Sequence, residues 1–209
     1  SGRNGTGEKY YDAKGLFVRD HIFNQCAPQT LYASWELESQ PDEHIGVNAG
    51  ETLEYDGLID KNDFIQSKTG NLITVKRGGK LILKNITVVG SDASVDSTIY
   101  NAGTLVVSNC VFRENHSHFG WGGVYHDRPG ARAVFYGCTF KENSALEGGV
   151  IAAEGSDVSV VYSSFFDNYS MLESDGVKQA EGAVAIAIAD ATLDLVSCTL
   201  VSNFCASAS

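Results

Sequence analysis

Proline, methionine and basic residues are scarce in this chain of 209 residues, and it has no long hydrophobic run. Three prolines and one methionine, set against 22 glycines, favour many short strands joined by turns over a helical bundle. The longest apolar candidate, residues 183–189, falls well short of the ~18 residues that a membrane-spanning helix needs. The sequence therefore predicts an all-β protein without a membrane span.

The deficit of basic residues gives the chain a formal net charge of -11, from 26 acidic and 15 basic side chains. An acidic surface repels phosphate backbones and anionic membranes. We therefore expect no nucleic-acid partner. The expected partner is a protein or a glycan, and the chain could form part of a larger assembly.

Five cysteines are present without a C-x-x-C pair or a zinc-type spacing, so no metal site is predicted from them. Four N-x-[ST] sequons favour a secretory route and a glycoprotein. We expect an extracellular, cell-surface or other oxidising luminal compartment. The sequon asparagines are Asn4, Asn85, Asn115 and Asn168.

An eleven-residue pattern recurs along the C-terminal two thirds of the chain: apolar-x-apolar, then a small residue or cysteine, then F-x-x-N. The copies begin at Leu81, Leu105, Ala133, Val158 and Leu193, which are 24, 28, 25 and 35 residues apart. A repeat of this length is typical of one coil of a solenoid. The pattern predicts a right-handed parallel β-helix of about five to seven coils.

Alignment of the copies places like side chains in columns that should stack between coils. Two columns are apolar, and a third contains Val88, Phe112, Phe140, Phe165 and Leu200. The last column should form an asparagine ladder, in which each amide bonds its neighbours and the turn backbone. The ladder residues are Asn115, Asn143, Asn168 and Asn203.

A glycine pair follows the F-x-x-N motif in two copies, as Gly122-Gly123 and Gly148-Gly149, and we align Glu181-Gly182 with them less well. Glycine permits a positive φ at a sharp bend. The longest repeat carries a polar insertion, roughly residues 171–180, which we expect to form a loop. Residues 1–44 are assigned to an irregular N-terminal cap, and residues 45–209 to the β-helix, within one folding unit.

The combination of F-x-x-N with G-G-apolar-apolar, as in 112–115 with 122–125 and 140–143 with 148–151, resembles the repeats of polymorphic outer membrane proteins. Those proteins are surface adhesins built on a β-helix. The resemblance covers residues 79–209. It implies the β-helix fold and an adhesin-like role, although function depends on surfaces that differ between members of one fold.

Three carboxylates, Glu114, Glu142 and Asp167, occupy the column before the ladder asparagines and should stack ~5 Å apart. One interpretation is an oxygen-ligand site for Ca²⁺, or an acid/base pair of a carbohydrate-active β-helix. The other, which we favour, is a solvated acidic ridge partly neutralised by Arg113 and Lys141. We accordingly predict no required cofactor.

The loop of residues 115–129 carries the richest group of polar and aromatic side chains. We favour an ordered, partly exposed loop whose aromatic residues bind a protein or a glycan. Three histidines could also form a metal site, but H-x-H with a distant histidine is a loose pattern. The candidate binding residues are His116, His118, Trp121, Tyr125, His126 and Arg128.

Cys110 and Cys138 share a column in adjacent coils, where a disulfide is geometrically feasible and buried free thiols are equally ordinary. The sequence carries no recognisable Ser/His/Asp context, phosphate loop or nucleotide fingerprint. We predict a non-catalytic adhesin-like or scaffold module. The alternatives are a polysaccharide lyase or hydrolase that uses the acidic ridge, and an accessory subunit of an extracellular or luminal assembly.

Overall fold

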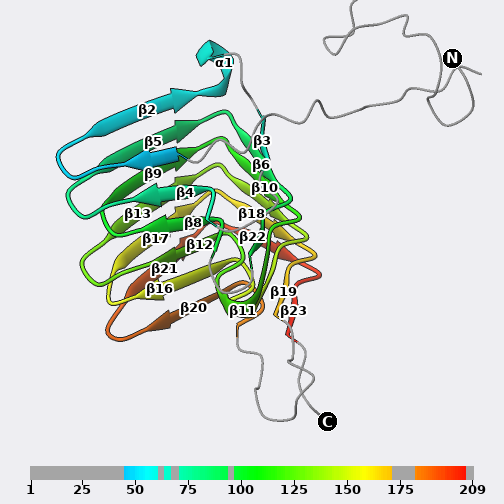
Figure 1. Ribbon diagram of the computed structural model, residues 1–209. Helices are drawn as coiled ribbons and strands as arrows, with labels where there is room; N and C mark the ends of the chain where they lie inside the picture. The colour runs from blue at the N-terminus through cyan, green and yellow to red at the C-terminus, as the bar shows by residue number, and fades with distance from the viewer. Residues whose placement is uncertain (1–44, 61–63, 67–70, 94–96, 171–181, 206–209) are drawn as a thin grey trace, which may run out of the picture. The chain divides into compact units, whose positions relative to one another are not determined.

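The computed structural model describes residues 45–60, 64–66, 71–93, 97–170 and 182–205. Apart from one short helix, α1 (Gly57–Asp60), the regular structure in these ranges consists of strands stacked in coils (Figure 1). The N-terminal cap predicted for residues 1–44 and the insertion predicted for residues 171–180 both lie outside the described residues.

The strands form four parallel sheets, which we number in the order in which the chain enters them. Sheet 1 contains β1 (Ile45–Val47), β4 (Ile73–Val75), β8 (Ile99–Asn101), β12 (Tyr125–Asp127), β16 (Ile151–Glu154) and β20 (Ala185–Ile188). Sheet 2 contains β2 (Thr52–Asp56), β5 (Lys80–Lys84), β9 (Thr104–Ser108), β13 (Arg132–Tyr136), β17 (Asp157–Val161) and β21 (Thr192–Val196).

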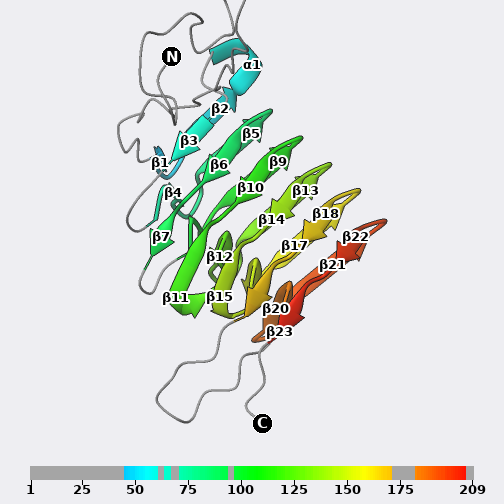
Figure 2. The same ribbon diagram turned by 90° about the vertical axis from the view of Figure 1, so that its right-hand side faces the viewer.

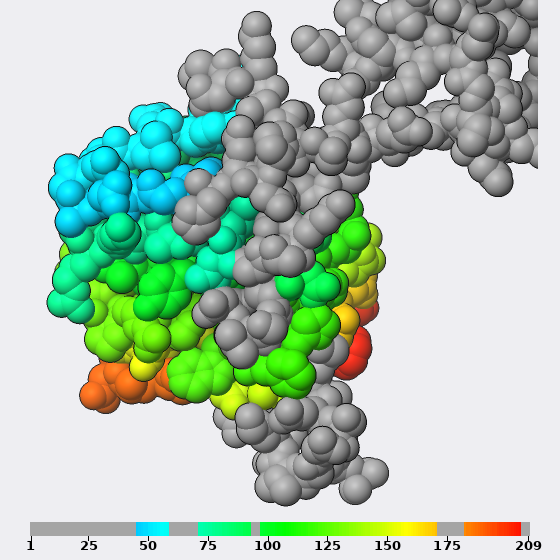
Figure 3. Space-filling model, in the orientation of Figure 1, coloured from blue at the N-terminus to red at the C-terminus, as the bar shows by residue number. Residues whose placement is uncertain are grey.

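Sheets 3 and 4 complete each coil. Sheet 3 contains β3 (Phe64–Gln66), β6 (Thr87–Val89), β10 (Val111–Arg113), β14 (Thr139–Lys141), β18 (Ser164–Phe166) and β22 (Thr199–Val201). Sheet 4 contains β7 (Asp92–Ala93), β11 (His116–Trp121), β15 (Ser144–Glu147), β19 (Tyr169–Ser170) and β23 (Phe204–Cys205). Figure 2 shows the strands of successive coils in parallel rows, and Figure 3 shows the coils as successive bands of colour.

Each strand pairs with the strand that follows it one coil later, and a parallel pair needs such a crossover connection. In sheet 2, for example, β9 pairs with β13 in the register Leu105↔Ala133 and Val107↔Phe135. This is the alignment that the repeat predicts. The parallel β-helix fold is thereby confirmed.

The predicted apolar columns fill the interior. Leu83, Val107, Phe135 and Val160 are all fully buried. In the next column, the rings of Phe112 and Phe140 stack with centroids 5.3 Å apart, and those of Phe140 and Phe165 with centroids 4.7 Å apart. These spacings are close to the ~4.8 Å between strands, so the coil repeat itself sets the aromatic stacking.

The four asparagines form a continuous ladder at the corner between sheets 3 and 4. The Asn143 side chain accepts hydrogen bonds from the backbone N and the Nδ2 of Asn115, at 3.1 and 2.9 Å. Its Nδ2 donates to Phe112 O at 3.0 Å and to Asn168 Oδ1 at 2.9 Å. Asn168 repeats this arrangement with Asn203. The ladder therefore pairs the buried backbone groups at this corner.

The glycine pair makes the tight corner before sheet 1, and its two positions have different requirements. The first glycine has a positive φ, 62° in Gly122 and 60° in Gly148. At the second position, a Cβ on Gly149 would collide with backbone carbonyl oxygens of Ala183 and Tyr169. No larger residue fits at Gly149 unless this backbone shifts, so Gly148 and Gly149 are glycines for two separate reasons.

The third copy of this corner differs from the sequence alignment by one residue. Val150 N donates to Val184 O, and Ile151 pairs with Ala185. The residues equivalent to the glycine pair are therefore Gly182 and Ala183, not Glu181 and Gly182. The sequence alignment was wrong here because the insertion before this corner hides the register. Gly182 has φ 63°, as the first position requires.

Cys110 and Cys138 lie in the predicted buried column, and both thiols are free in the structure. Burial raises the pKa of Cys110 to about 11 and that of Cys138 to about 12. The thiols make weak hydrogen bonds to backbone carbonyls, Cys110 Sγ to Ser108 O at 3.3 Å and Cys138 Sγ to Tyr136 O at 3.5 Å. Both thiols are therefore protonated packing groups at neutral pH.

Candidate functional site

The acidic column lies on the outside of the corner, and the ladder asparagines point inward beside it. Glu114, Glu142 and Asp167 each have a positive φ between 53° and 56°. Glu114 forms an ion pair with Arg113, and Glu142 with Lys141 at 3.2 Å. About half of each glutamate side chain is exposed, 49% and 47%. Asp167 is also exposed, and it follows Phe166. The column is therefore a solvated ridge in which the two glutamates have basic neighbours.

The predicted histidines do not converge on one point. His116 and His118 lie in β11 of sheet 4, where His116 Nδ1 is 2.7 Å from Ser144 Oγ and His118 Nε2 is 2.5 Å from Asp92 Oδ1. Burial lowers the pKa of His116. His126 lies in β12 of sheet 1. Within the described ranges, no group of three or more His, Cys, Asp or Glu side chains is arranged to hold a metal ion.

Tyr125 is fully buried, so its assignment to an exposed binding surface was wrong. Its hydroxyl accepts a hydrogen bond from Asn101 Nδ2 at 3.0 Å and donates to Asp127 Oδ2 at 2.8 Å. Ser156 Oγ and Glu154 N also donate to Asp127, at 2.6 and 2.7 Å. Burial raises the pKa of this carboxyl group. Tyr125 and Asp127 therefore form an internal polar network that links three coils.

Trp121, His126 and Arg128 do come together, and they are joined by Tyr100 and Glu154 from the neighbouring coils. The His126 ring makes edge-to-face contacts with Trp121 and Tyr100, with centroids 5.4 and 6.2 Å apart. Arg128 Nε donates to Tyr100 OH at 2.7 Å, and Nη1 donates to Glu154 Oε2 at 3.2 Å. We call these five residues the aromatic-charged cluster.

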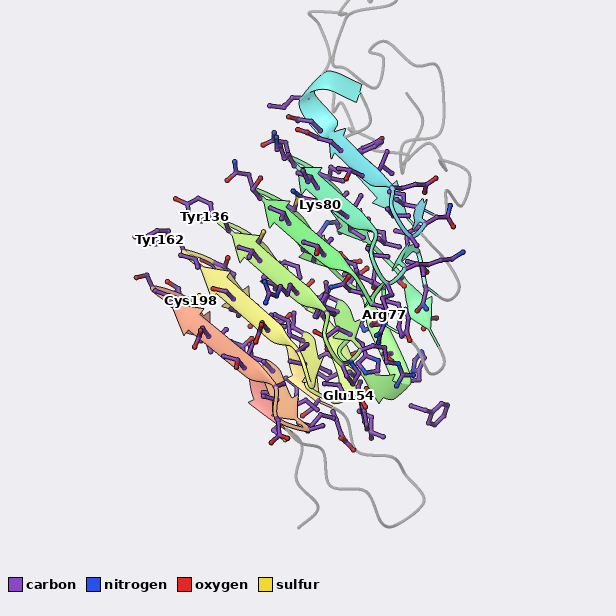
Figure 4. The ribbon with its side chains drawn as sticks, turned by 90° about the vertical axis from the view of Figure 1, so that its left-hand side faces the viewer. Arg77, Lys80, Tyr136, Glu154, Tyr162 and Cys198 are labelled. Carbon is purple, nitrogen blue, oxygen red and sulfur yellow. The ribbon has the colours of Figure 1, made fainter. Side chains whose placement is uncertain are left out.

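Sheet 1 positions four of these residues on its outer side, and Trp121 ends β11 of sheet 4. Tyr100 and His126 are register partners in β8 and β12, and their side chains face away from the core because the residues on either side face inward. Arg128 follows β12 directly, and Glu154 ends β16. In Figure 4, Glu154 and Arg77 lie on the side of the coils away from Tyr136 and Tyr162.

Charge within the cluster is balanced. His126 Nε2 lies 3.5 Å from Glu154 Oε2, but burial and the positive charge of Arg128 lower the pKa of His126. His126 is therefore neutral at pH 7, and Arg128 and Glu154 form the ion pair. Half of the Arg128 side chain is exposed, so donors of its guanidinium remain accessible to a ligand.

Sequence reasoning missed Tyr100 and Glu154 because each is more than 25 residues away from its partner in the cluster. The positions of these two residues within the repeat did indicate that they lie beside His126 and Arg128. Tyr100 is equivalent to His126 one coil earlier, and the register of β12 with β16 continues to place Glu154 opposite Arg128 one coil later. Reading the outward positions of three consecutive coils together would have assembled the cluster.

A second exposed surface lies on the outer face of sheet 2. Tyr136 and Tyr162 contact edge to face, with ring centroids 5.6 Å apart, and Val134 beside them is also exposed. Figure 4 shows the two tyrosines next to each other at one edge of the sheet. Within the described ranges, neither ring has a cationic partner like the Arg128 guanidinium that lies over the Tyr100 ring. We therefore regard the aromatic-charged cluster as the candidate site.

The sequons occupy different environments. Asn115 and Asn168 are fully buried in the ladder, which leaves no room for a glycan in the folded coil. Asn85 Nδ2 donates to Asp56 Oδ1 at 2.8 Å. Asn4 lies outside the described residues. None of the helices in the described ranges has the length and hydrophobicity to cross a membrane.

Comparison with known proteins gives the same fold. Neither a curated protein nor a solved structure shows significant similarity to the chain. Residues 45–208 match the family described as "Right handed beta helix region". The match covers most of the chain and the whole of the coiled region described above. With its parallel register, its apolar columns and its asparagine ladder, this chain belongs to the right-handed β-helix family.

Proposed function

We propose that the chain is a non-catalytic, adhesin-like binding module of an extracellular or luminal compartment, and that it recognises a glycan through the aromatic-charged cluster. The observation that carries this proposal is the convergence of two aromatic rings, an arginine and a carboxylate from consecutive coils on one outer surface. A sugar ring has apolar C–H faces and a rim of hydroxyl groups, so it suits aromatic rings flanked by charged hydrogen-bonding groups.

The chemistry of the cluster favours binding over hydrolysis. Glycoside hydrolysis generally uses two carboxyl groups about 5 to 9 Å apart across the scissile bond. Glu154 is instead held beside Arg128 and His126. The neighbouring Asp127 is fully buried and faces the core, so it cannot reach a ligand on the surface. In the acidic ridge, Glu114 and Glu142 are exposed and paired with Arg113 and Lys141, which does not suit an acid/base pair either.

A glycan array probed with the purified chain tests this proposal, followed by calorimetric titration of the glycans that bind. We expect Arg128→Gln to weaken binding by about tenfold or more, because hydrogen bonds to charged groups contribute about 1.5–3 kcal/mol. The matched control is Arg132→Gln. Arg132 is also exposed and faces a carboxylate of the next coil, Asp157 at 3.6 Å, but it lies on sheet 2. Glu142→Gln controls for the acidic ridge.

Equal binding by the Arg128→Gln and Arg132→Gln variants would exclude the cluster as the site. Release of sugars from a bound polysaccharide, abolished by Glu142→Gln, would instead establish the carbohydrate-active alternative. If the array is silent and a protein ligand loses affinity specifically with Arg128→Gln, the cluster is a protein-binding surface and the glycan assignment is wrong.

A further inference from the structure

The lysines and arginines of the described ranges divide into two groups. Five of the eight form an ion pair with a carboxylate, namely Lys84, Arg113, Arg128, Arg132 and Lys141. The other three, Lys76, Arg77 and Lys80, are exposed and form no ion pair within these ranges. They lie between the end of β4 and the first residue of β5, in residues 76–80, which we call the basic turn. On a chain with a net charge of -11, this segment is a local excess of positive charge.

Two of these three cations bond to neutral oxygen atoms instead of carboxylates. Lys76 Nζ donates to Asn48 Oδ1 at 2.9 Å, and Arg77 Nη2 donates to Pro129 O at 3.4 Å. The carboxylate of Glu51, in the turn one coil earlier, accepts hydrogen bonds from the backbone N and the Nδ2 of Asn48. A neutral oxygen orients a cation without cancelling its charge, so the basic turn keeps its positive charge for a ligand.

The turn one coil later is too small to cover the basic turn. Four residues separate β4 from β5, and four separate β12 from β13, but only Ala102 and Gly103 separate β8 from β9. A Cβ on Gly103 would collide with the backbone carbonyl oxygens of Lys76 and Gly79, so this short turn lies directly against the basic turn. Its largest side chain is the methyl group of Ala102. The short turn therefore places no bulky group between the basic turn and residues 128–131.

Arg77 crosses the short turn and connects the basic turn to the aromatic-charged cluster. Equivalent positions two coils apart are separated by about 10 Å, and the Arg77 side chain spans this distance to contact Pro129 O. Pro129 directly follows Arg128, whose guanidinium carbon lies 5.7 Å from the centroid of the Tyr100 ring. Figure 4 shows Arg77 on the same side of the coils as Glu154 of the cluster. The cations of the basic turn and the rings of the cluster therefore lie along one surface.

We infer that the glycan bound by the cluster contains an acidic sugar, and that the basic turn binds its carboxylate or sulfate group. The inference rests on the proposed function, because it assigns a charge to the same ligand. The guanidinium of Arg77 is planar and has donors beyond the one used by Pro129, and such a fork matches the oxygens of an anionic group. Lys76 and Lys80 add positive charge on flexible side chains. The aromatic rings then contact the sugar to which the anionic group is attached.

The surroundings of this surface favour a ligand with an isolated acidic group over a polyanion. Exposed carboxylates lie on both sides of it along the stack, Glu51 just before β2 and Asp157 at the start of β17. A nucleic acid or a heavily sulfated chain carries charge at every repeat, so it would extend past the cations and be repelled by these carboxylates. A mostly neutral glycan with one acidic sugar avoids this repulsion. Such a glycan is therefore the ligand class that we assign to the site.

Acidic and neutral glycans that share one core test the assigned charge, for example sialyllactose and sulfated lactose against lactose, beside the equivalent pairs on a glycan array. We expect the acidic glycans that bind to do so about tenfold more tightly than their neutral cores, with a preference that weakens as salt is added. Arg77→Gln should reduce this preference to about twofold or less, because it removes a charge-assisted hydrogen bond. The matched pair Lys80→Gln and Lys84→Gln removes one charge from either end of β5. Lys80→Gln should weaken the preference, whereas Lys84→Gln should keep it, since Lys84 pairs with Glu54.

The outcomes separate this inference from the proposed function. Equal binding of acidic and neutral glycans, weakened by Arg128→Gln but not by Arg77→Gln, overturns the inference and leaves the proposed function intact. An equal loss in Arg77→Gln and Lys84→Gln also overturns it, because net charge alone then explains the effect. Tighter binding of heparin or single-stranded DNA than of any glycan with one acidic sugar would show that the surface binds a polyanion instead. An array on which no glycan binds removes both proposals. Circular dichroism verifies that each variant is folded.

Discussion

Replacement of Asn143 by alanine tests the asparagine ladder most directly. Asn143 lies in the middle of the ladder and is fully buried. Its side chain makes four hydrogen bonds: two accepted from Asn115, one donated to Phe112 O and one donated to Asn168 Oδ1. Alanine makes none of these bonds, and the groups that lose their partners lie in a corner that is buried from solvent.

The expected cost follows from that count. A buried hydrogen bond contributes about 1 kcal/mol net, so four bonds give a loss of about 4 kcal/mol in the free energy of unfolding. Asn203→Ala is the matched control at the end of the ladder. Asn203 makes three such bonds, two accepted from Asn168 and one donated to Phe165 O. It is partly exposed, so water can replace part of them, and we expect a loss of about 1–2 kcal/mol.

Urea unfolding followed by circular dichroism measures both losses by linear extrapolation. The comparison between the two variants is more informative than either value alone, because the same chemical group is deleted at two degrees of burial. A loss below about 1 kcal/mol for Asn143→Ala, or one no larger than that for Asn203→Ala, would show that the ladder does not stabilise the coils as described.

Two further predictions concern the glycine corner and the histidine of the cluster. Gly149→Ala should cost about 3 kcal/mol through overpacking against the Ala183 and Tyr169 carbonyls, whereas Gly130→Ala, which meets open space at φ 85°, should cost about 1 kcal/mol in the same assay. Equal costs would contradict the close packing. Burial lowers the pKa of His126 in the folded state, so at acidic pH this histidine binds a proton more readily in the unfolded state than in the folded state. The contribution of neutral His126 to the free energy of unfolding is therefore complete above the ordinary histidine pKa of about 6.5, and it decreases as the pH falls below that value. Urea midpoints between about pH 7.5 and 5 should therefore fall less in His126→Gln than in the wild type, and parallel profiles would refute this.

The fold was predictable because its signal repeats. Each apolar column contributes one residue per coil, so the apolar pattern is seen five times. A pattern that could arise by chance in one strand is much less easily produced by chance in five aligned copies. The F-x-x-N asparagines were identified for the same reason, and they were placed correctly at a corner. The register was lost only at Gly182, where the insertion separates two copies by 35 residues instead of 24 to 28.

The site was only partly predictable, because burial depends on a side chain's direction within its own coil. Tyr125 stands beside His126 in a polar loop, and nothing in the local sequence shows that it points inward. Its position in the repeat does, since it is equivalent to Ile99 and Ile151, both fully buried. Tyr100 and Glu154 were missed because a surface cluster has no requirement to repeat, and its members come from different coils.

The direction of the asparagine ladder has a consequence for how the chain is built during synthesis. In each rung the backbone N–H belongs to the earlier coil and the accepting Oδ1 to the later one, as from Asn115 to Asn143 and from Asn143 to Asn168. During synthesis, the backbone N–H at this corner of a completed coil therefore has no acceptor until the asparagine of the next coil has been synthesised. Each new coil can dock on the hydrogen-bond donors of the coil before it, so the solenoid can fold coil by coil from its N-terminal end.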